Sequence, residues 1–166
     1  MYPSWDNFRI TKKNMKTILN QSENMGGVVK IWAIPSLDYS IAGETLQILN
    51  QDNMVEIYIQ EDSCALIEDD IAGGAFKTEI VAQVPCDHPD TITIIKQMER
   101  VKKYNVILVD GNGNYKLAGS KSVPLRFSAK LTTGATTASL NHYAISFLAK
   151  AITTRAVFIN NPFQNL

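Results

Sequence analysis

From residue 28 onward the chain alternates hydrophobic and polar positions in short runs that are bounded by turn-forming residues. Alternation with a period of two, together with many β-branched and aromatic side chains, is typical of β-strands. The expected strands are VVKIWAI, TLQIL, MVEIYI, CALI, FKTEIVAQV, YNVILV, YKLAG, PLRFSAKL, HYAISFLA and RAVFI. The strongest hairpin signal is the turn Asp110-Gly111-Asn112-Gly113-Asn114 between YNVILV and YKLAG.

One segment has the spacing of a helix instead. Its apolar positions recur every three or four residues: Ile94, Ile95, Met98 and Val101. This pattern predicts an α-helix over about 89–103, with Pro89 in the first turn, where its missing N–H leaves no donor unpaired. Either Asp87 or Asp90 can accept hydrogen bonds from the free N–H groups of that turn.

These patterns divide the chain into three regions. Residues 1–25 form an N-terminal arm whose apolar residues have loosely helical spacing: Phe8, Met15, Ile18 and Leu19. A short amphipathic helix is marginal in water, so the arm would have to dock on its own domain or on a neighbour. Residues 26–160 form a single β-rich domain and residues 161–166 a C-terminal tail. We expect a mainly β (α+β) fold: an antiparallel β-sandwich or barrel of about nine strands with one flanking α-helix.

The composition fits one domain: 166 residues, 45% of them hydrophobic and 19% charged, can bury a core without a disulfide or a metal. No apolar run approaches the roughly 20 residues that cross a bilayer. The opening MYPSWDNFRITKK lacks the basic-then-apolar order of a secretory signal. We therefore expect a protein that is made and kept in cytoplasm, with no membrane span.

The charges of the chain sum to zero but are unevenly distributed. Residues 1–30 hold five basic and two acidic side chains, residues 31–95 one and twelve, and residues 96–166 ten and two, which gives net charges of +3, −11 and +8. Either these blocks interleave in the fold and neutralise one another, or opposite faces carry opposite sign. In the second case copies of the chain could stack head to tail through complementary charge.

Two clusters of charge are candidate surfaces. The acidic cluster brackets the run CALI and comprises Glu61, Asp62, Glu68, Asp69 and Asp70. Paired carboxylates could bind a divalent cation or act as general acid and base, although solvated hairpin tips produce the same pattern. The basic cluster is a candidate partner surface and comprises Lys96, Arg100, Lys102 and Lys103. It could meet phosphate, but only Tyr104 and Tyr115 are near it in sequence for base stacking, so the nucleic-acid signal is weak.

The remaining motifs do not support catalysis or metal binding. Cys86-Asp87-His88 combines a thiol, a carboxylate and an imidazole, but it lies in the acidic block, which disfavours a thiolate. The possible zinc ligands lack the paired spacing of structural sites: Cys64, Cys86, His88 and His142. The Asp110 turn begins like a calcium loop, but Tyr115 stands where glycine is needed and Lys121 where glutamate is needed. We expect no enzymatic activity, no cofactor and no metal.

The opening GGVVKIWAIP, at residues 26–35, is followed by a set of turn and packing positions: Asp110, Gly111, Asn112, Gly113, Leu117, Gly119, Pro124, Gly134, Tyr143 and Phe158. Together they resemble a family of tailed-phage and prophage virion structural proteins, seen especially in phages of Bacteroides-like hosts. The likeness covers residues 26–159. The chain departs from the family pattern at residues 150–154, where the family has a shorter and more polar link.

The resemblance implies a non-enzymatic virion subunit of the tail or head-tail connector, assembled in the host bacterial cytoplasm into a ring or tube around the DNA passage. Its partners would be copies of itself and neighbouring tail, portal or connector proteins, and the acidic block could line a channel through which DNA slides. The alternative is a small carbohydrate- or protein-binding module at the tail tip. That alternative would be favoured by exposed aromatic residues on one face, from among Trp5, Trp32, Tyr39, Tyr58 and Tyr143.

Overall fold

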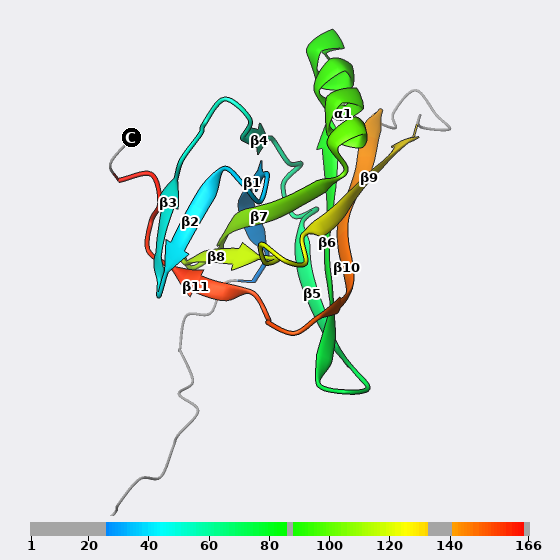
Figure 1. Ribbon diagram of the computed structural model, residues 1–166. Helices are drawn as coiled ribbons and strands as arrows, with labels where there is room; N and C mark the ends of the chain where they lie inside the picture. The colour runs from blue at the N-terminus through cyan, green and yellow to red at the C-terminus, as the bar shows by residue number, and fades with distance from the viewer. Residues whose placement is uncertain (1–25, 86–87, 133–140, 165–166) are drawn as a thin grey trace, which may run out of the picture.

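The computed structural model describes residues 26–85, 88–132 and 141–164. The predicted N-terminal arm lies outside this part, as do Cys86, Asp87 and Gly134. The described chain forms one helix, α1 (Pro89–Val101), and eleven strands (Figure 1). The strands are β1 (Val28–Ile34), β2 (Tyr39–Ala42), β3 (Thr45–Ile48), β4 (Val55–Ile57), β5 (Ala65–Ile71), β6 (Ala75–Pro85), β7 (Lys103–Asp110), β8 (Tyr115–Ala118), β9 (Leu125–Thr132), β10 (His142–Ile152) and β11 (Val157–Ile159).

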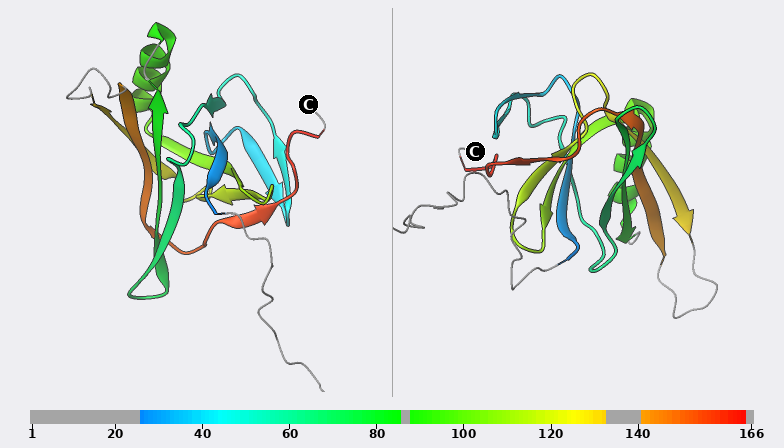
Figure 2. Two further views of the ribbon diagram at one scale, coloured as in Figure 1. Left: turned by 180° about the vertical axis from the view of Figure 1, so that it is seen from behind. Right: turned by 90° about the horizontal axis from the view of Figure 1, so that it is seen from below.

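The strands pair antiparallel, and nine of them belong to one connected sheet that folds into two layers. The first layer contains β4, β1, β7, β8 and β11, and the second contains β5, β6, β10 and β9. The hairpin β2–β3 forms a separate small sheet. Figure 2 shows the two layers from behind and from below. The fold is therefore a β-sandwich with a flanking helix and not a closed barrel. This confirms the first of the two predicted alternatives.

Strand β7 connects the two layers. It pairs with β1 and β8 along most of its length, while its first residues, Lys103 and Tyr104, pair with Arg126 and Leu125 of β9. Every residue from Tyr104 to Val109 is buried. A strand that is covered on both faces has a nearly continuous apolar sequence, which accounts for the run YNVILV.

The main core fills the space between the layers. Strand β7 contributes Tyr104 and Leu108 to it, and the second layer contributes Ile80, Phe127 and Phe147. The rings of Phe127 and Phe147 lie 5.1 Å apart, and Tyr104 meets Phe147 edge to face. Aromatic pairs of this geometry stabilise a core beyond the area that they bury.

A second core covers the outer face of the first layer. Trp32 of β1 and Ile107 of β7 point into it, and the β2–β3 hairpin adds Tyr39. Phe163 packs on Trp32 with 4.6 Å between the ring centroids. The segment predicted as a tail, 161–166, thus contributes to a core in the part of it that the structure describes.

The predicted strands are present, and two segments differ from prediction. The additional strand β2 has only one buried residue, Tyr39, so its sequence lacks a clear alternation. Strand β5 extends from Ala65 to Ile71 and so includes Glu68, Asp69 and Asp70, which were expected at a hairpin tip. It pairs with β6 over this whole length, and pairing outweighs the low strand propensity of acidic residues.

Helix α1 confirms the predicted helix with a different cap and an earlier end. The N-cap residue is His88, whose Nδ1 accepts a hydrogen bond from the backbone N–H of Asp90 at 3.2 Å. The helix ends at Val101, because Lys102 has a left-handed φ of 65° and Lys103 already belongs to β7.

The predicted apolar side of α1 is only half covered. Ile95 and Met98 are buried in the main core, whereas Ile94 is 41% exposed and Val101 53% exposed. Figure 1 shows why: the helix stands beside β9 and projects past the first layer. One side of it therefore lacks a neighbour among the described residues.

Asn105 is a fully buried polar residue on β7 and faces the second core. Its amide nitrogen donates hydrogen bonds to Ser36 Oγ at 3.0 Å and to the Tyr39 hydroxyl at 2.9 Å. Gly119, at the end of β8, has φ +92°, and a Cβ atom there would clash with Asn105 Oδ1. Glycine is required here because any side chain would displace the Asn105 amide.

We therefore expect Gly119→Ala to lower the free energy of unfolding by about 3 kcal/mol, through backbone strain and the loss of the Asn105 hydrogen bonds. Gly43→Ala is the matched control, since Gly43 has φ +61° with nothing within 4 Å of the added Cβ. That substitution should destabilise by only about 1 kcal/mol. Urea denaturation of both variants measures the difference, and equal losses would contradict a special role for Asn105 and Gly119.

Candidate functional site

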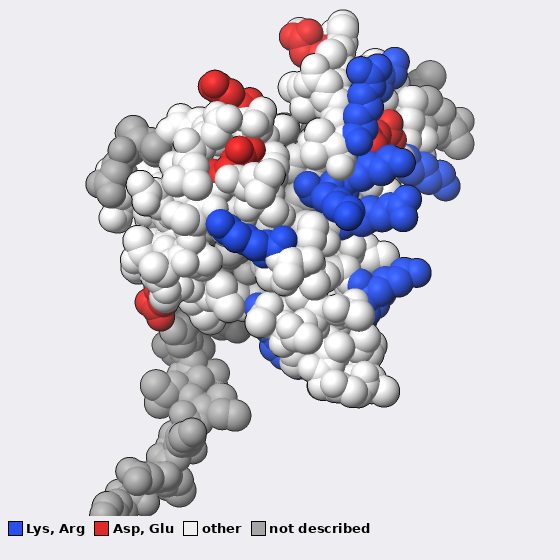
Figure 3. All heavy atoms as spheres, viewed as in Figure 1, with Lys and Arg blue, Asp and Glu red and all other residues white. Residues whose placement is uncertain are grey.

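Six basic residues form one exposed surface across three elements. Figure 3 shows basic side chains gathering over α1 and the region below it. We call this set the cationic surface; it comprises Lys96, Arg100, Lys102, Lys103, Arg126 and Lys130. The four predicted partner residues all belong to it. The sequence pattern missed the last two because β9 reaches this place only through its pairing with β7 and β10.

The cationic surface makes no ion pair with the described part of the chain, although Figure 3 shows an acidic side chain among the basic ones. No ion pair joins any of its six residues to another described residue. Lys103 lies directly opposite Arg126 in the β7–β9 pair, and like charges in that position are destabilising. Lys102 occupies a φ of 65°, where glycine is the usual residue. The like-charged pair and the left-handed lysine both lower the stability of the fold. Destabilising features that occur together are typical of functional sites.

Acidic side chains occupy a different region. The chain has no Lys or Arg between Lys30 and Lys77. Strands β2 and β3 hold no charged residue, so the charges of this region are acidic side chains in the turns and on β4. We call the exposed residues of this region the acidic surface; they are Glu44, Asp52 and Glu56. Figure 3 shows basic as well as acidic side chains over this part of the molecule, and Lys121 Nζ lies 5.4 Å from the ring centroid of Tyr39 in β2. Neither of the two predicted charge arrangements, interleaved blocks or opposed faces, therefore describes this side of the molecule alone.

The predicted acidic cluster does not form one patch. Glu61 and Asp62 lie in the turn before β5, while the other three residues lie within the strand. Asp69 is paired in register with Lys77 of β6. Glu68 and Asp70 belong to a contact with the chain between β10 and β11, which is described next.

Arg155 joins the end of β10 to the β5–β6 hairpin. Its Nη2 lies 2.6 Å from Asp70 Oδ1, and its guanidinium lies 4.3 Å above the ring of Phe76. Glu68 Oε1 accepts a hydrogen bond from the backbone N–H of Ala156 at 2.7 Å. These two acidic residues therefore hold a connection in place, and their carboxylates are occupied by protein partners.

Two of the residues considered for catalysis or metal binding, Cys64 and His88, have a place in the packing of the fold. Cys64 is buried, and desolvation raises the pKa of its thiol to about 12, which opposes a nucleophilic thiolate. His88 caps α1, and Cys86 and Asp87 lie outside the described residues. No group of three or more His, Cys, Asp or Glu residues suitable for a metal occurs within the described ranges.

The positions that carry the family resemblance have packing and turn roles. Leu117 and Gly119 pack against the second core and Asn105, Pro124 precedes β9, and Tyr143 lies half-buried on β10. Phe158 of β11 is 58% exposed and receives Lys116 over its ring at 4.9 Å. The residues of the β7–β8 turn are Asp110, Gly111, Asn112 and Gly113.

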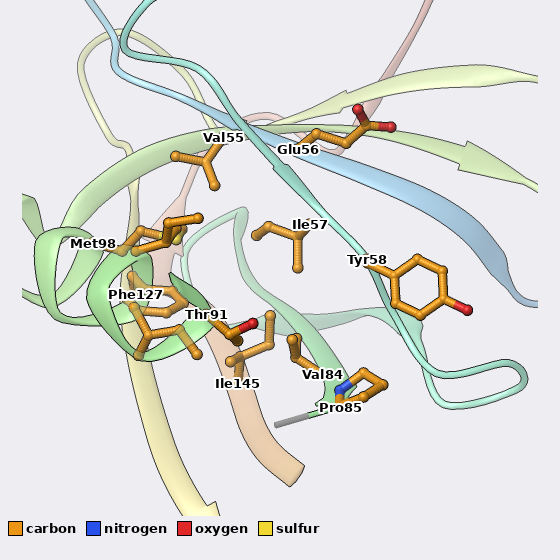
Figure 4. A pocket seen from close by; sticks show the side chains of 12 residues that line it. Val55, Glu56, Ile57, Tyr58, Val84, Pro85, Thr91, Met98, Phe127 and Ile145 are labelled. Atoms are coloured by element: carbon orange, nitrogen blue, oxygen red, sulfur yellow. The ribbon is translucent and has the colours of Figure 1, made fainter. Parts of the chain in front are cut away.

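A groove opens between β4 and α1 (Figure 4). It has a volume of about 420 Å³ and reaches the main core. In Figure 4 the side chains of Val55 and Ile57 lie across the gap from Met98 and Phe127. Sequence reasoning missed this feature, because its walls come from five separate segments of the chain.

Aromatic residues do not gather at the surface of the described chain. Trp32 and Tyr39 are buried in the second core, and Tyr143 packs against the main core. Tyr58, 79% exposed, stands at the edge of the groove. Trp5 lies outside the described residues.

Comparison of the chain with protein-family models, with curated proteins and with solved structures yields no match. Within the residues that the structure describes, no helix combines the length and apolarity needed to span a membrane.

The Asp110 carboxylate organises the β7–β8 turn. Its Oδ1 accepts hydrogen bonds from the backbone N–H groups of Asn112 and Asn114, both at 3.0 Å, and Lys116 Nζ lies 3.2 Å from Oδ2. Desolvation opposes the charged form, but the hydrogen bonds from Asn114 and Lys116 outweigh it, so the pKa of Asp110 is lowered.

A lowered folded-state pKa stabilises the fold above the unfolded-state pKa, about 3.9 for Asp, and this contribution disappears as the pH falls through the folded value. We expect Asp110→Asn to be less stable than the unmodified chain at pH 7, by about 1 kcal/mol. The difference should shrink as the pH falls below about 4. Denaturation at several pH values tests this, with the exposed Asp52→Asn expected to stay within about 0.5 kcal/mol throughout. A difference independent of pH would contradict the assigned role.

Proposed function

We propose that the chain is a non-enzymatic structural subunit that assembles with copies of itself, and that the assembly is a ring or tube in the tail or head-tail connector of a bacteriophage virion. The observation that carries the proposal is the gathering of unpaired basic side chains at one place. The cationic surface on α1, β7 and β9 has no ion pairs within the described chain, and the acidic surface on β2–β4 has no basic neighbour in sequence.

Two different surfaces of opposite sign favour a heterologous contact, in which one patch of a copy meets another patch of the next. Repetition of such a contact produces a ring when the rotation closes and a stacked tube when it does not. Charge complementarity steers the encounter and sets the register of the subunits. The chain as a whole has a formal charge of zero, so an assembly of this kind accumulates no net charge.

The cationic surface favours a protein partner over nucleic acid. Binding to single strands generally uses aromatic side chains on which bases stack. Tyr104 is buried, and Tyr115 packs near Phe163 in the second core, so neither is available beside this surface. DNA would pass through the lumen of the assembly without sequence-specific contacts.

The virion assignment rests on the resemblance carried by the turn and packing positions. Under this proposal the subunit would also contact tail, portal or connector proteins. The alternative of a carbohydrate-binding module at the tail tip receives no support from the aromatic residues, because those described do not share an exposed face.

We expect the double substitution Lys103→Glu with Arg126→Glu to weaken self-association at least about tenfold, because it removes the cationic centre of the contact. Sedimentation velocity and native mass spectrometry of the full chain measure this effect. Association of the unmodified chain should also weaken when salt rises from about 0.05 to 0.5 M, since salt screens exposed charges.

The matched control reverses two exposed basic residues elsewhere, Lys30→Glu with Lys150→Glu, and should change association less than the test pair does. Adding Glu44→Lys and Asp52→Lys to the test pair should restore association, because both surfaces then carry reversed charge. A chain that stays monomeric at all concentrations, alone and with virion partners, would refute the proposal.

A further inference from the structure

The β5–β6 hairpin ends in an exposed apolar turn. Ile71 pairs with Ala75 at the end of the ladder, and the turn between them consists of Ala72, Gly73 and Gly74. We call residues 71–75 the hairpin tip. It contains no charged residue, Ile71 is 38% exposed, and the three turn residues are exposed as well. Figure 1 shows the tip at the lower end of the described chain, beyond the end of β10.

The chain between β10 and β11 fixes the direction of this hairpin. The guanidinium carbon of Arg155 lies 4.3 Å from the centroid of the Phe76 ring, and its Nη2 lies 2.6 Å from Asp70 Oδ1. Phe76 also pairs in register with Ile152 of β10. A two-stranded ribbon by itself is only marginally stable in water. These contacts, which involve both strands of the hairpin, therefore hold the tip in place as a projection.

The groove between β4 and α1 lies at the opposite end of the same hairpin. Strand β6 leads from Ala75 in the tip to Val84 and Pro85, which line the groove. It has 11 residues, so at about 3.3 Å per residue the tip and the groove are roughly 30 Å apart. Strand β6 is paired on both sides, with β5 and with β10, which keeps this separation fixed. The tip therefore cannot reach the groove of its own copy.

The groove matches the hairpin tip in polarity. Glu56 is the one charged residue among the described residues that line it, and it pairs with Trp32 of β1, which points into the second core. The Glu56 side chain therefore lies on the face of β4 that is turned away from the groove, as Figure 4 shows. Val55 and Ile57 form one wall, and Ile94, 41% exposed, lies at the rim of the other. Contact between the tip and these walls requires no charge to lose its water.

An apolar projection and an apolar pocket at different places on one molecule produce a heterologous contact that repeats from copy to copy. We propose that the hairpin tip of one copy binds in the groove between β4 and α1 of the next copy. Ile71 and Ala72 would cover Ile94 and Ile57. Because the tip and the groove lie at opposite ends of β6, repetition would stack the copies along the direction of this strand. The inference rests on the proposed function, since it adds a second contact between associating copies, but it involves no residue of the cationic surface.

Matched neutral substitutions on β5 test the contact. Ile71→Gln should weaken association about fivefold, because it removes apolar surface from the tip. Ile67→Gln is the control: Ile67 lies on the same strand and is 41% exposed, but it is outside the tip, and its substitution should change association less than about twofold. Sedimentation velocity in about 0.5 M salt, which screens contacts between charged surfaces, measures the difference. Equal effects of the two substitutions would overturn the proposal.

A double-mutant cycle tests whether the tip and the groove meet. Ile94→Gln, at the groove rim, should weaken association about as much as Ile71→Gln does, and circular dichroism verifies that α1 is intact. The two substitutions together should weaken association clearly less than the product of their separate effects, because either one already removes the contact. Ile67→Gln combined with Ile94→Gln should give the full product. A full product for the tip and groove pair as well would contradict the contact.

Cross-linking on the full chain identifies the segment that the tip contacts. A photo-reactive phenylalanine analogue replaces Ala72, and the protein is mixed with ¹⁵N-labelled chain before illumination. We expect cross-links between a labelled and an unlabelled chain, to peptides that contain β4 or α1. The same analogue at Leu37, which is 89% exposed in the turn between β1 and β2, should yield few of these products. Cross-links to other elements, or none while the same sample sediments as an assembly, would overturn the proposal.

Separate variants report on the two contacts. If Lys103→Glu with Arg126→Glu leaves association unchanged, the contact of the cationic surface is refuted and the proposed function with it. If Ile71→Gln leaves association unchanged, the contact of the hairpin tip is refuted. A chain that is monomeric under all conditions would refute both contacts.

Discussion

Strand β7 pairs with strands of both layers and contributes side chains to both cores. Its backbone is paired on both sides, and its six central residues are buried, alternately toward the main core and the second core. Neither layer is complete without it, because β1 and β8 pair with its length and β9 pairs with its first residues. The one polar residue in this run is Asn105, whose amide nitrogen donates to two hydroxyl groups and for which Gly119 leaves space. Its buried Oδ1 has no hydrogen-bond partner among the described residues.

The same junction produces the most unusual surface of the protein. The helix must end where β7 begins, and β9 must reach β7 at that point, so basic residues from three elements meet there. Lys102 in a left-handed conformation and Lys103 opposite Arg126 both oppose stability. Their combination would be explained if a partner neutralised the charge, which is the contact that we propose.

The groove has a related origin. A sandwich whose layers share a strand has ends that must be closed by other elements, and α1 closes one end only in part. Ile95 and Met98 complete the core, whereas Ile94 and the walls of β4 stay uncovered by described residues. The fold therefore leaves both a cluster of basic side chains and an apolar groove uncovered by described residues.

Local pattern determined much of this fold from the sequence: the strands, the single helix and the β7–β8 turn, because alternation, helical spacing and turn residues act over a few neighbours. It also identified Lys96, Arg100, Lys102 and Lys103 as one group, since they are close together along the chain. Only the tertiary structure decided which strands share β7, that Arg126 and Lys130 join the cationic surface, and that Glu68 and Asp70 bind Arg155. Sandwich and barrel have the same strand pattern, and the choice between them depends on edge strands and on contacts between residues far apart in sequence, which local spacing does not encode.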